Sequence, residues 1–185
     1  LDNCVVGRIV GIINRKANKK WEVRNVRFSM IEFIDDLRVS KALLDAVAEW
    51  GRTQGMDALQ GPLGITDFDK EGMLVEDFQL MGSMNTLYNL DYYPRHMEAY
   101  GMEKEVDLVS VRIRIPEEVP ARYSRVAQYA REQIGLRVMK GTSEDFFDKG
   151  YGIKVFNMVN EAFQPIFGFS SLSDKQINIL VHKYL

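Results

Sequence analysis

One stretch, from Phe28 to Pro62, restricts the possible folds more than any other part of the chain. It opens with an apolar run that ends at Ile34 and is followed by two aspartates. Apolar residues then recur at steps of four, four and three, the period of one helix face, at Val39, Leu43, Val47 and Trp50. A second short apolar segment, Met56 to Leu59, comes after this run. The stretch therefore predicts a strand, an amphipathic helix and a second strand.

Both ends of this helix carry residues that favour helix termini. The carboxylate of Asp35 or Asp36 can accept a hydrogen bond from the first-turn amides, and its charge suits the positive end of the helix dipole. Gly55 can adopt the left-handed conformation that ends a helix. Because the amides at a helix start point outward together and bind anions, residues 35–41 are where a phosphorylated cofactor is expected, if the protein binds one.

Composition narrows the class of protein. The 185 residues are enough for one ordinary domain or two small ones, and 46% hydrophobic with 27% charged residues is normal for a soluble globular protein. The net charge of −2 does not indicate a nucleic-acid or membrane partner. One cysteine and two histidines argue against a disulfide framework and a metal site. Neither a span of roughly 20 apolar residues nor a signal peptide is visible, so we expect a cytoplasmic location.

Two strands are expected before the central helix. The first covers Cys4–Asn14, which is rich in β-branched residues, and the second covers Trp21–Phe33. The basic segment between them, residues 15–20, is typical of a solvated hairpin turn, or in a sharper interpretation of a contact for an acidic group. Cys4 on the first strand is expected to be a buried, inert thiol.

The chain after the central stretch alternates loop, helix and strand patterns. Residues 61–85 predict a long loop with one short strand at 73–75. Asn89–Tyr100 predicts a helix that Gly101 ends, with His96 on its exposed face. Val106–Ile115 alternates apolar and polar residues and is the clearest strand pattern of the chain.

The tail is expected to be mostly helical. Pro116 and Pro120 mark a domain boundary. A short strand is predicted at 136–140, and Gly150 and Gly152 are expected to break the middle helix in two. The predicted helices are Ala121–Ile134, Ser143–Phe163 and a last one from Ser173 or Asp174 to Tyr184.

Segments spread over Val5–Leu172 carry a family pattern: VVGRIVGIIN, SMIEFIDD, ALLDAVAEWGRTQGMDALQGP, EGMLVEDF, YNLDYYPRHMEAYGMEKEVDL and VFNMVNEAFQPIFGFSSLS. They resemble the GNAT N-acetyltransferase superfamily, and more closely its bacterial two-module proteins, whose acceptor is not generally assigned. The resemblance implies an α/β (α+β) fold with a mostly antiparallel mixed sheet flanked by helices, and a helical C-terminal segment. It implies a fragment in which residues 1–115 are the sheet core of one module and 116–185 a connecting helix and the start of a second, mostly helical module.

The same resemblance implies acetyl-CoA as cofactor, whereas the expectation of no metal comes from the composition. The family binds the pyrophosphate at a Gln/Arg-x-x-Gly-x-Gly/Ala turn, and Asp35, Arg38 and Ser40 stand at its three motif positions. Both glycines are therefore replaced, and a Cβ stands where the backbone would approach phosphate. Asp35 would repel phosphate, whereas Arg38 and Lys41 could attract it. The predicted cofactor-binding residues are Met30, Arg38, Ser40 and Lys41.

The predicted catalytic residues are Glu32 and Tyr93. Glu32 ends the strand before the helix, where a base would take the proton of an attacking amine. The family's general-acid tyrosine falls on Met97, which cannot donate a proton, and Tyr93 lies one helical turn away. The alternative is that Glu32 is simply solvated and that Tyr93 packs in the core. No Ser/His/Asp or Cys/His set stands at a recognisable spacing.

Three functions are compatible with these residues. The first is acetyl transfer from acetyl-CoA to a small-molecule or peptide amine. The second is a degenerate, non-catalytic GNAT-like module, favoured by the missing glycines and by Met97. The third is an aminoacyl-tRNA-dependent transferase, which the negative charge disfavours because nucleic-acid binding is largely electrostatic. The sequence leaves open whether the chain forms a homo-oligomer.

Overall fold

The computed structural model describes residues 4–84 and 86–184, so residues 1–3 of the predicted first module and Asn85 of the predicted loop lie outside it. The chain divides into two compact units. The first unit comprises Leu1–Asp107 and Met158–Ser173, and the second comprises Leu108–Asn157 and Asp174–Leu185. The first division thus falls at Asp107, before the boundary predicted at 115, and part of the predicted tail belongs to the first unit.

The first unit is built on a mixed sheet with the strand order β1-β2-β3. β1 (Gly7–Ile12) is antiparallel to β2 (Asn25–Phe33), and β2 is parallel to β3 (Ala58–Gln60). The parallel pairing uses the first three residues of β2, Asn25 to Arg27. Most of β2 therefore extends beyond its parallel neighbour. This strand–helix–strand order confirms the prediction for the central stretch.

β2 is irregular near its middle. The pairing of β1 with β2 shifts between Arg8 and Val10, which are opposite Glu32 and Ser29. Met30, inside this shift, has a φ of 48°, a left-handed conformation that side chains other than glycine rarely adopt. The irregularity leaves the Met30 side chain 64% exposed on an otherwise largely buried strand.

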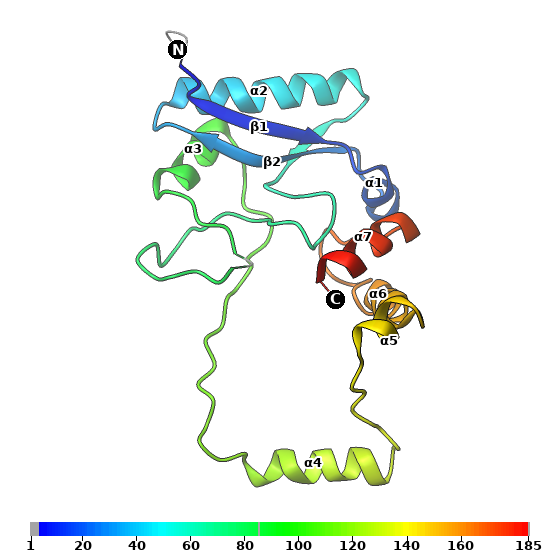
Figure 1. The fold of residues 1–185 in the computed structure, drawn as a ribbon. Coiled ribbons are helices and arrows are strands. Elements are labelled where there is room, and N and C mark those ends of the chain that lie inside the picture. The colour runs from blue at the N-terminus through cyan, green and yellow to red at the C-terminus, as the bar shows by residue number, and fades with distance from the viewer. Residues whose placement is uncertain (1–3, 85, 185) are drawn as a thin grey trace. The chain divides into compact units, whose positions relative to one another are not determined.

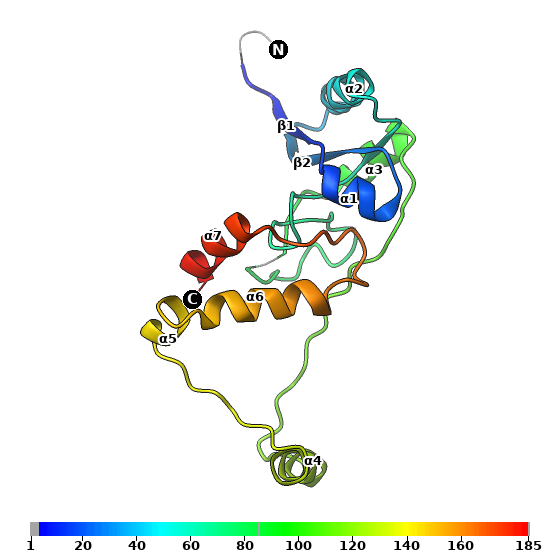
Figure 2. The same ribbon diagram turned by 90° about the vertical axis from the view of Figure 1, so that its right-hand side faces the viewer.

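Helix α2 (Leu37–Thr53) packs against β1 and β2, as both ribbon views show (Figures 1 and 2). The side chain of Asp36 accepts from the Arg38 amide and caps the helix, and Gly55 follows its end with a φ of 78°. Both predicted termini are confirmed. The buried face of the helix consists of Val39, Ser40, Leu44, Val47 and Gly51.

The segment predicted as a hairpin turn is instead helix α1 (Arg15–Trp21), so this prediction was wrong. The Asn14 side chain accepts from the Ala17 amide and starts the helix, and Glu22 ends it with a φ of 55°. Ala17 is only 2% exposed and is the buried residue through which helix α1 packs against the rest of the unit. Lysine and arginine have good intrinsic helix propensity, so a basic run is compatible with a helix as well as with a turn.

Helix α3 (Tyr92–Tyr100) confirms the predicted helix, and Gly101 ends it with a φ of 93°. Its buried residues are Tyr93, His96 and Met97. The prediction that His96 lies on the exposed face was wrong, because this side chain is inside the unit and the residue is 1% exposed.

The long loop before α3 is also confirmed, but its predicted short strand is not formed. Residues 73–75 have no strand pairing. Instead the Asn89 side chain binds both backbone groups of Leu74, accepting from its N–H at 2.7 Å and donating to its carbonyl at 3.1 Å. The Asn89 side chain thus makes the hydrogen bonds to the Leu74 backbone that a neighbouring strand would otherwise make.

The second unit contains the remaining helices (Figure 1). They are α4 (Ala121–Glu132), α5 (Ser143–Phe147), α6 (Tyr151–Ala162), whose last residues belong to the first unit, and α7 (Asp174–Tyr184). Gly150, with a φ of 72°, separates α5 from α6 as predicted, whereas Gly152 lies inside α6. Within the described residues, none of the helices has the length and apolar character that crossing a membrane requires.

Two strand predictions in this part of the chain were wrong. Residues 106–115 and 136–140 have no strand pairing, and Val111 and Ile115 are 75% and 88% exposed. Alternation of apolar and polar residues marks a segment that fits a sheet, but a strand forms only when a neighbouring backbone pairs with it.

Candidate functional site

The end of β2 brings together the two predicted catalytic residues. The Tyr93 hydroxyl donates to Glu32 Oε2 at 3.0 Å and accepts from the Phe33 amide at 3.3 Å. The neighbouring Tyr92 hydroxyl donates to the Phe33 carbonyl at 2.6 Å. Phe33 also stacks on the Tyr93 ring with centroids 4.2 Å apart. Helix α3 therefore holds Phe33, the last residue of β2, through both of its backbone polar groups.

Tyr93 and Glu32 differ in how far each is buried. Tyr93 is 5% exposed, and burial is the main cause that raises the pKa of its phenol to about 12. Its hydrogen bond to Glu32 acts in the same direction, whereas the Phe33 amide acts against it. The Glu32 side chain is 59% exposed and lies 3.8 Å from the Arg8 guanidinium. Glu32 is thus open to solvent, and Tyr93 reaches that surface through Glu32.

The start of α2 carries two carboxylates. Asp36 Oδ1 accepts from the Arg38 amide at 2.9 Å, and both Asp36 oxygens also bind the Arg38 guanidinium. These bonds from Arg38 lower the pKa of Asp36 to about 2. Asp35, one residue earlier, accepts from Arg95 at 2.8 Å. The amides of a helix start can bind an anion. Here the Arg38 amide already donates to Asp36, and the carboxylates of Asp35 and Asp36 both place negative charge at this end of α2.

A Ser–His–Asp line crosses from α2 to α3. Ser40 Oγ lies 2.7 Å from His96 Nδ1, and His96 Nε2 lies 2.8 Å from Asp35 Oδ1. The hydrogen bond from His96 is the largest cause that lowers the pKa of Asp35. Spacing in the sequence had not indicated such a set, so that prediction missed it. Ser40 is 2% exposed and its hydroxyl also contacts the Leu37 carbonyl at 3.2 Å. A nucleophile must meet its substrate, so the line ties two helices together and does not serve as a catalytic triad.

The predicted cofactor residues are not brought together as one cation-rich patch. Arg38 is exposed but paired with Asp36, and Lys41 Nζ is paired with Asp45 at 2.5 Å. Ser40 lies in the interior. Met30 stands exposed on the irregular part of β2. These residues do not fit a pyrophosphate at the α2 start. The Ser40 hydroxyl is buried, the cations of Arg38 and Lys41 are paired with carboxylates, and the Arg38 amide already donates to Asp36.

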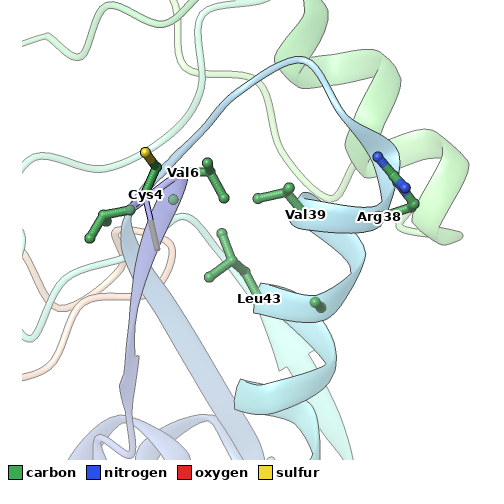
Figure 3. A pocket seen from close by; sticks show the side chains of 8 residues that line it. Cys4, Val6, Arg38, Val39 and Leu43 are labelled. Atoms are coloured by element: carbon green, nitrogen blue, oxygen red, sulfur yellow. The ribbon is translucent and has the colours of Figure 1, made fainter. Parts of the chain in front are cut away.

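A groove of about 490 Å³ lies beside α2, between its first turns and the chain that leads into β1 (Figure 3). Val6, Val39 and Leu43 point into it, and Arg38 stands at its margin (Figure 3). Cys4, predicted to be buried, is exposed at this groove. Its lining is largely apolar and offers little to recognise a phosphate. No group of three or more acidic, histidine or cysteine residues in the described ranges is placed to hold a metal ion.

Comparison with known proteins shows a similarity that covers part of the chain. The chain is 29% identical over 106 residues to Protein YghO of Escherichia coli K12. The match covers 57% of this chain and 27% of that protein, so the chain spans about a quarter of that relative's length. No protein-family model and no solved structure matches.

The residue that sequence reasoning missed is His96, and a signal for it was present. Tyr93, Met97 and Tyr100 follow the three-to-four-residue spacing of one helix face, and His96 lies on the same side of the turn as Tyr93 and Met97. Reading α3 as amphipathic would have turned His96 toward the core. Its partners Ser40 and Asp35 could not be identified, since they depend on how two helices pack.

Proposed function

We propose that the first unit is a GNAT-type module that has lost the phosphate-binding helix start and works as a non-catalytic structural or ligand-binding module. The observation that carries this proposal is the pair of carboxylates at the start of α2, one of which occupies the Arg38 amide. A pyrophosphate there would meet two negative charges and no free cation in the predicted set.

The path of the chain supports the GNAT-type part of the proposal. β2 leads directly into α2, β3 returns parallel to β2, and α3 follows. β2 is irregular at Met30 and extends beyond the residues that pair with β3. The segments before residue 108 that resemble the family lie on or beside this path, so resemblance and topology support the same assignment for that part of the chain.

A ligand titration of the full chain tests the proposal. If CoA or acetyl-CoA bound with a Kd of about 10 μM, roughly 1 mM ligand would stabilise the fold by about 2.7 kcal/mol and raise Tm. We expect no rise in Tm with either ligand. A rise that Arg38→Glu or Lys41→Glu abolishes would overturn the proposal.

The carboxylates can be tested directly by removing their charge. Asparagine caps a helix about as well as aspartate, so Asp36→Asn keeps the α2 start folded, and Asp35→Asn keeps an oxygen acceptor for His96. We expect the double variant Asp35→Asn/Asp36→Asn to gain weak affinity for CoA or inorganic pyrophosphate. Glu49→Gln, an exposed change farther along α2, removes one negative charge and serves as the control for each single variant, Asp35→Asn and Asp36→Asn.

A second candidate function, N-acyl transfer to an amine, is favoured by the Glu32–Tyr93 pair. An exposed carboxylate at a strand end could take the proton of an ammonium, and the buried Tyr93 hydroxyl would hold that carboxylate in place. Release of thiol from acetyl-CoA with a panel of amines, abolished by Glu32→Gln and kept by Glu49→Gln, would establish this candidate over the first. The amine acceptor and the cytoplasmic location stay predictions.

The tRNA-dependent transferase also stays a prediction. Binding to tRNA with a steep salt dependence would support it, because neutralised phosphates release counterions. With a net charge of −2, we expect no such binding.

A further inference from the structure

Helix α4 has an apolar face that the rest of the described chain leaves uncovered. Tyr123, Val126 and Ala130 recur at steps of three and four and form this face. No residue of α4 is buried, and Tyr123 and Val126 are 53% and 66% exposed. A helix of 12 residues is marginal in water by itself, because most helical stability comes from packing of the apolar face. The face therefore needs a covering surface from another molecule.

The borders of this face are basic. α4 contains three arginines and one glutamate, a net charge of +2. The Arg122 guanidinium lies over the Tyr123 ring at 4.7 Å and so stands at one edge of the face, and helix geometry puts Arg131 at the other edge. Among the described residues the ion pairs all lie outside α4, so its arginines have no carboxylate partner. A surface that covers α4 should therefore carry carboxylates.

The same chain has a surface of matching character, which we call the acidic loop: residues 77–84 and 86–91. It contains Asp77 and Asp91 and no lysine or arginine, a net charge of −2, and neither carboxylate is in an ion pair among the described residues. Methionine side chains adapt to irregular apolar surfaces, and basic amphipathic helices bind such surfaces by their apolar face. The apolar residues that the loop exposes are Leu80 (51%), Met81 (92%), Met84 (88%), Tyr88 (60%) and Leu90 (51%).

We propose that two copies of the chain form a two-fold symmetric dimer in which α4 of each copy packs its apolar face on the acidic loop of the other. Two-fold symmetry uses the same pair of surfaces twice, so both α4 faces are covered and the charges of +2 and −2 meet in each contact. The apolar contact provides affinity, and the charges of Arg122 and Arg131 opposite Asp77 and Asp91 fix the orientation. Each contact is small, so we expect a Kd of roughly 1–100 μM.

Sedimentation velocity of the full chain tests the dimer. The native chain should show a monomer–dimer equilibrium that high salt weakens, because salt screens exposed charges. Arg122→Glu/Arg131→Glu and Asp77→Lys/Asp91→Lys each put like charges in both contacts and should weaken dimerisation at least tenfold. Mixing the two variants should restore a dimer. In the mixture the reversed α4 meets the reversed loop in one contact, and the native surfaces meet in the other. Restoration also shows that both variants are folded.

The matched control is Arg15→Glu/Lys19→Glu on α1, which changes the net charge equally at exposed positions and should dimerise like the native chain. A native chain that stays monomeric at about 1 mM overturns the proposal, whether hydrogen exchange finds the α4 amides open or covered by their own chain. A mixture of the two variants that stays monomeric also overturns it. So does capture of the monomeric chain, through α4, by vesicles of anionic lipid.

Discussion

Ser40 Oγ lies 2.7 Å from His96 Nδ1 in the interior of the first unit, where both residues are at most 2% exposed. The contact joins the first turn of α2 to the middle of α3, and His96 Nε2 extends it to Asp35. Buried polar groups are tolerated when their hydrogen bonds are made, and both ring nitrogens of His96 have partners. The same contact that resembles part of a catalytic set therefore fixes how two helices pack.

The first prediction concerns this contact. His96→Ala leaves the buried Ser40 hydroxyl without its partner and opens a cavity, so the free energy of unfolding should fall by about 2–4 kcal/mol. Urea unfolding followed by near-UV circular dichroism measures the loss. Arg95→Ala is the control, because Arg95 contacts the same Asp35 from an exposed position and an exposed ion pair contributes little. Equal losses in both variants would contradict the role given to the buried ring.

The sequence allowed prediction of local features set by short-range chemistry. The Asp36 cap, the left-handed glycines Gly55 and Gly101, and the Gly150 break all follow from backbone preferences within a few residues. The proximity of Glu32 and Tyr93 did not follow from spacing. It came from a family resemblance, and the structure adds the hydrogen bond between them.

Features that depend on distant neighbours were not predictable in the same way. The 106–115 segment has the best strand alternation but no pairing partner within the described residues. The 158–173 segment joins the first unit through contacts such as the Arg27–Gly168 hydrogen bond, between residues far apart in the chain. Periodicity describes one segment, whereas pairing and docking require the matching surface of another.

The second prediction concerns the Tyr93 hydroxyl. Its folded pKa of about 12 lies above the ordinary tyrosine value of 10, so its contribution to stability is fully present below pH 10 and is lost as the pH rises toward 12. Tyr93→Phe removes this pH dependence and leaves the Phe33 amide without its acceptor, at a loss of about 1–2 kcal/mol near pH 7. Burial also raises the pKa of Tyr92 and of Tyr100, so spectroscopic titration of tyrosinate in the native chain should show a late phase from several tyrosines, in which the amplitude near pH 12 belongs to Tyr93. Persistence of that amplitude in Tyr93→Phe would assign it to another residue.

The third prediction concerns Glu71 in the loop beside Arg27. Burial raises its pKa from 4.5 to about 7, with further contributions from Asp67 and Asp69, while Arg27 opposes the shift. Because the folded value is the higher one, the stabilisation is fully present below about pH 4.5 and is lost as the pH rises through 7. Glu71→Gln should therefore unfold at higher urea concentration than the native chain at pH 8, with a much smaller difference at pH 5.

The control for this comparison is Glu76→Gln, which changes the same charge at an exposed position of the same loop. It should leave the urea midpoint nearly unchanged at both pH values. A midpoint of Glu71→Gln that rises equally at pH 5 and pH 8 would show that ionisation of this carboxyl does not limit stability.

The last prediction concerns Gly51, where α2 lies close to the sheet. A Cβ at Gly51 would stand 2.5 Å from Val26 Cγ1 and 2.9 Å from Val26 Cβ, on a strand residue that is 2% exposed. Gly51→Ala must push the helix off β2, and overpacking of this kind lowers the free energy of unfolding by about 1–3 kcal/mol. This loss opposes the gain of roughly 0.5–1 kcal/mol that alanine normally brings to a helix interior.

Gly55→Ala separates this packing effect from backbone strain. Gly55 has a φ of 78° with open space around it, so alanine there incurs only the left-handed penalty of about 1–2 kcal/mol. The two variants should differ in a second measurement, because displacement of α2 by Gly51→Ala also moves Ser40 away from His96. Adding Ser40→Ala should then lower the stability of Gly51→Ala by less than it lowers that of Gly55→Ala. Additive losses in both backgrounds would mean that Gly51 and the Ser40–His96 contact are independent.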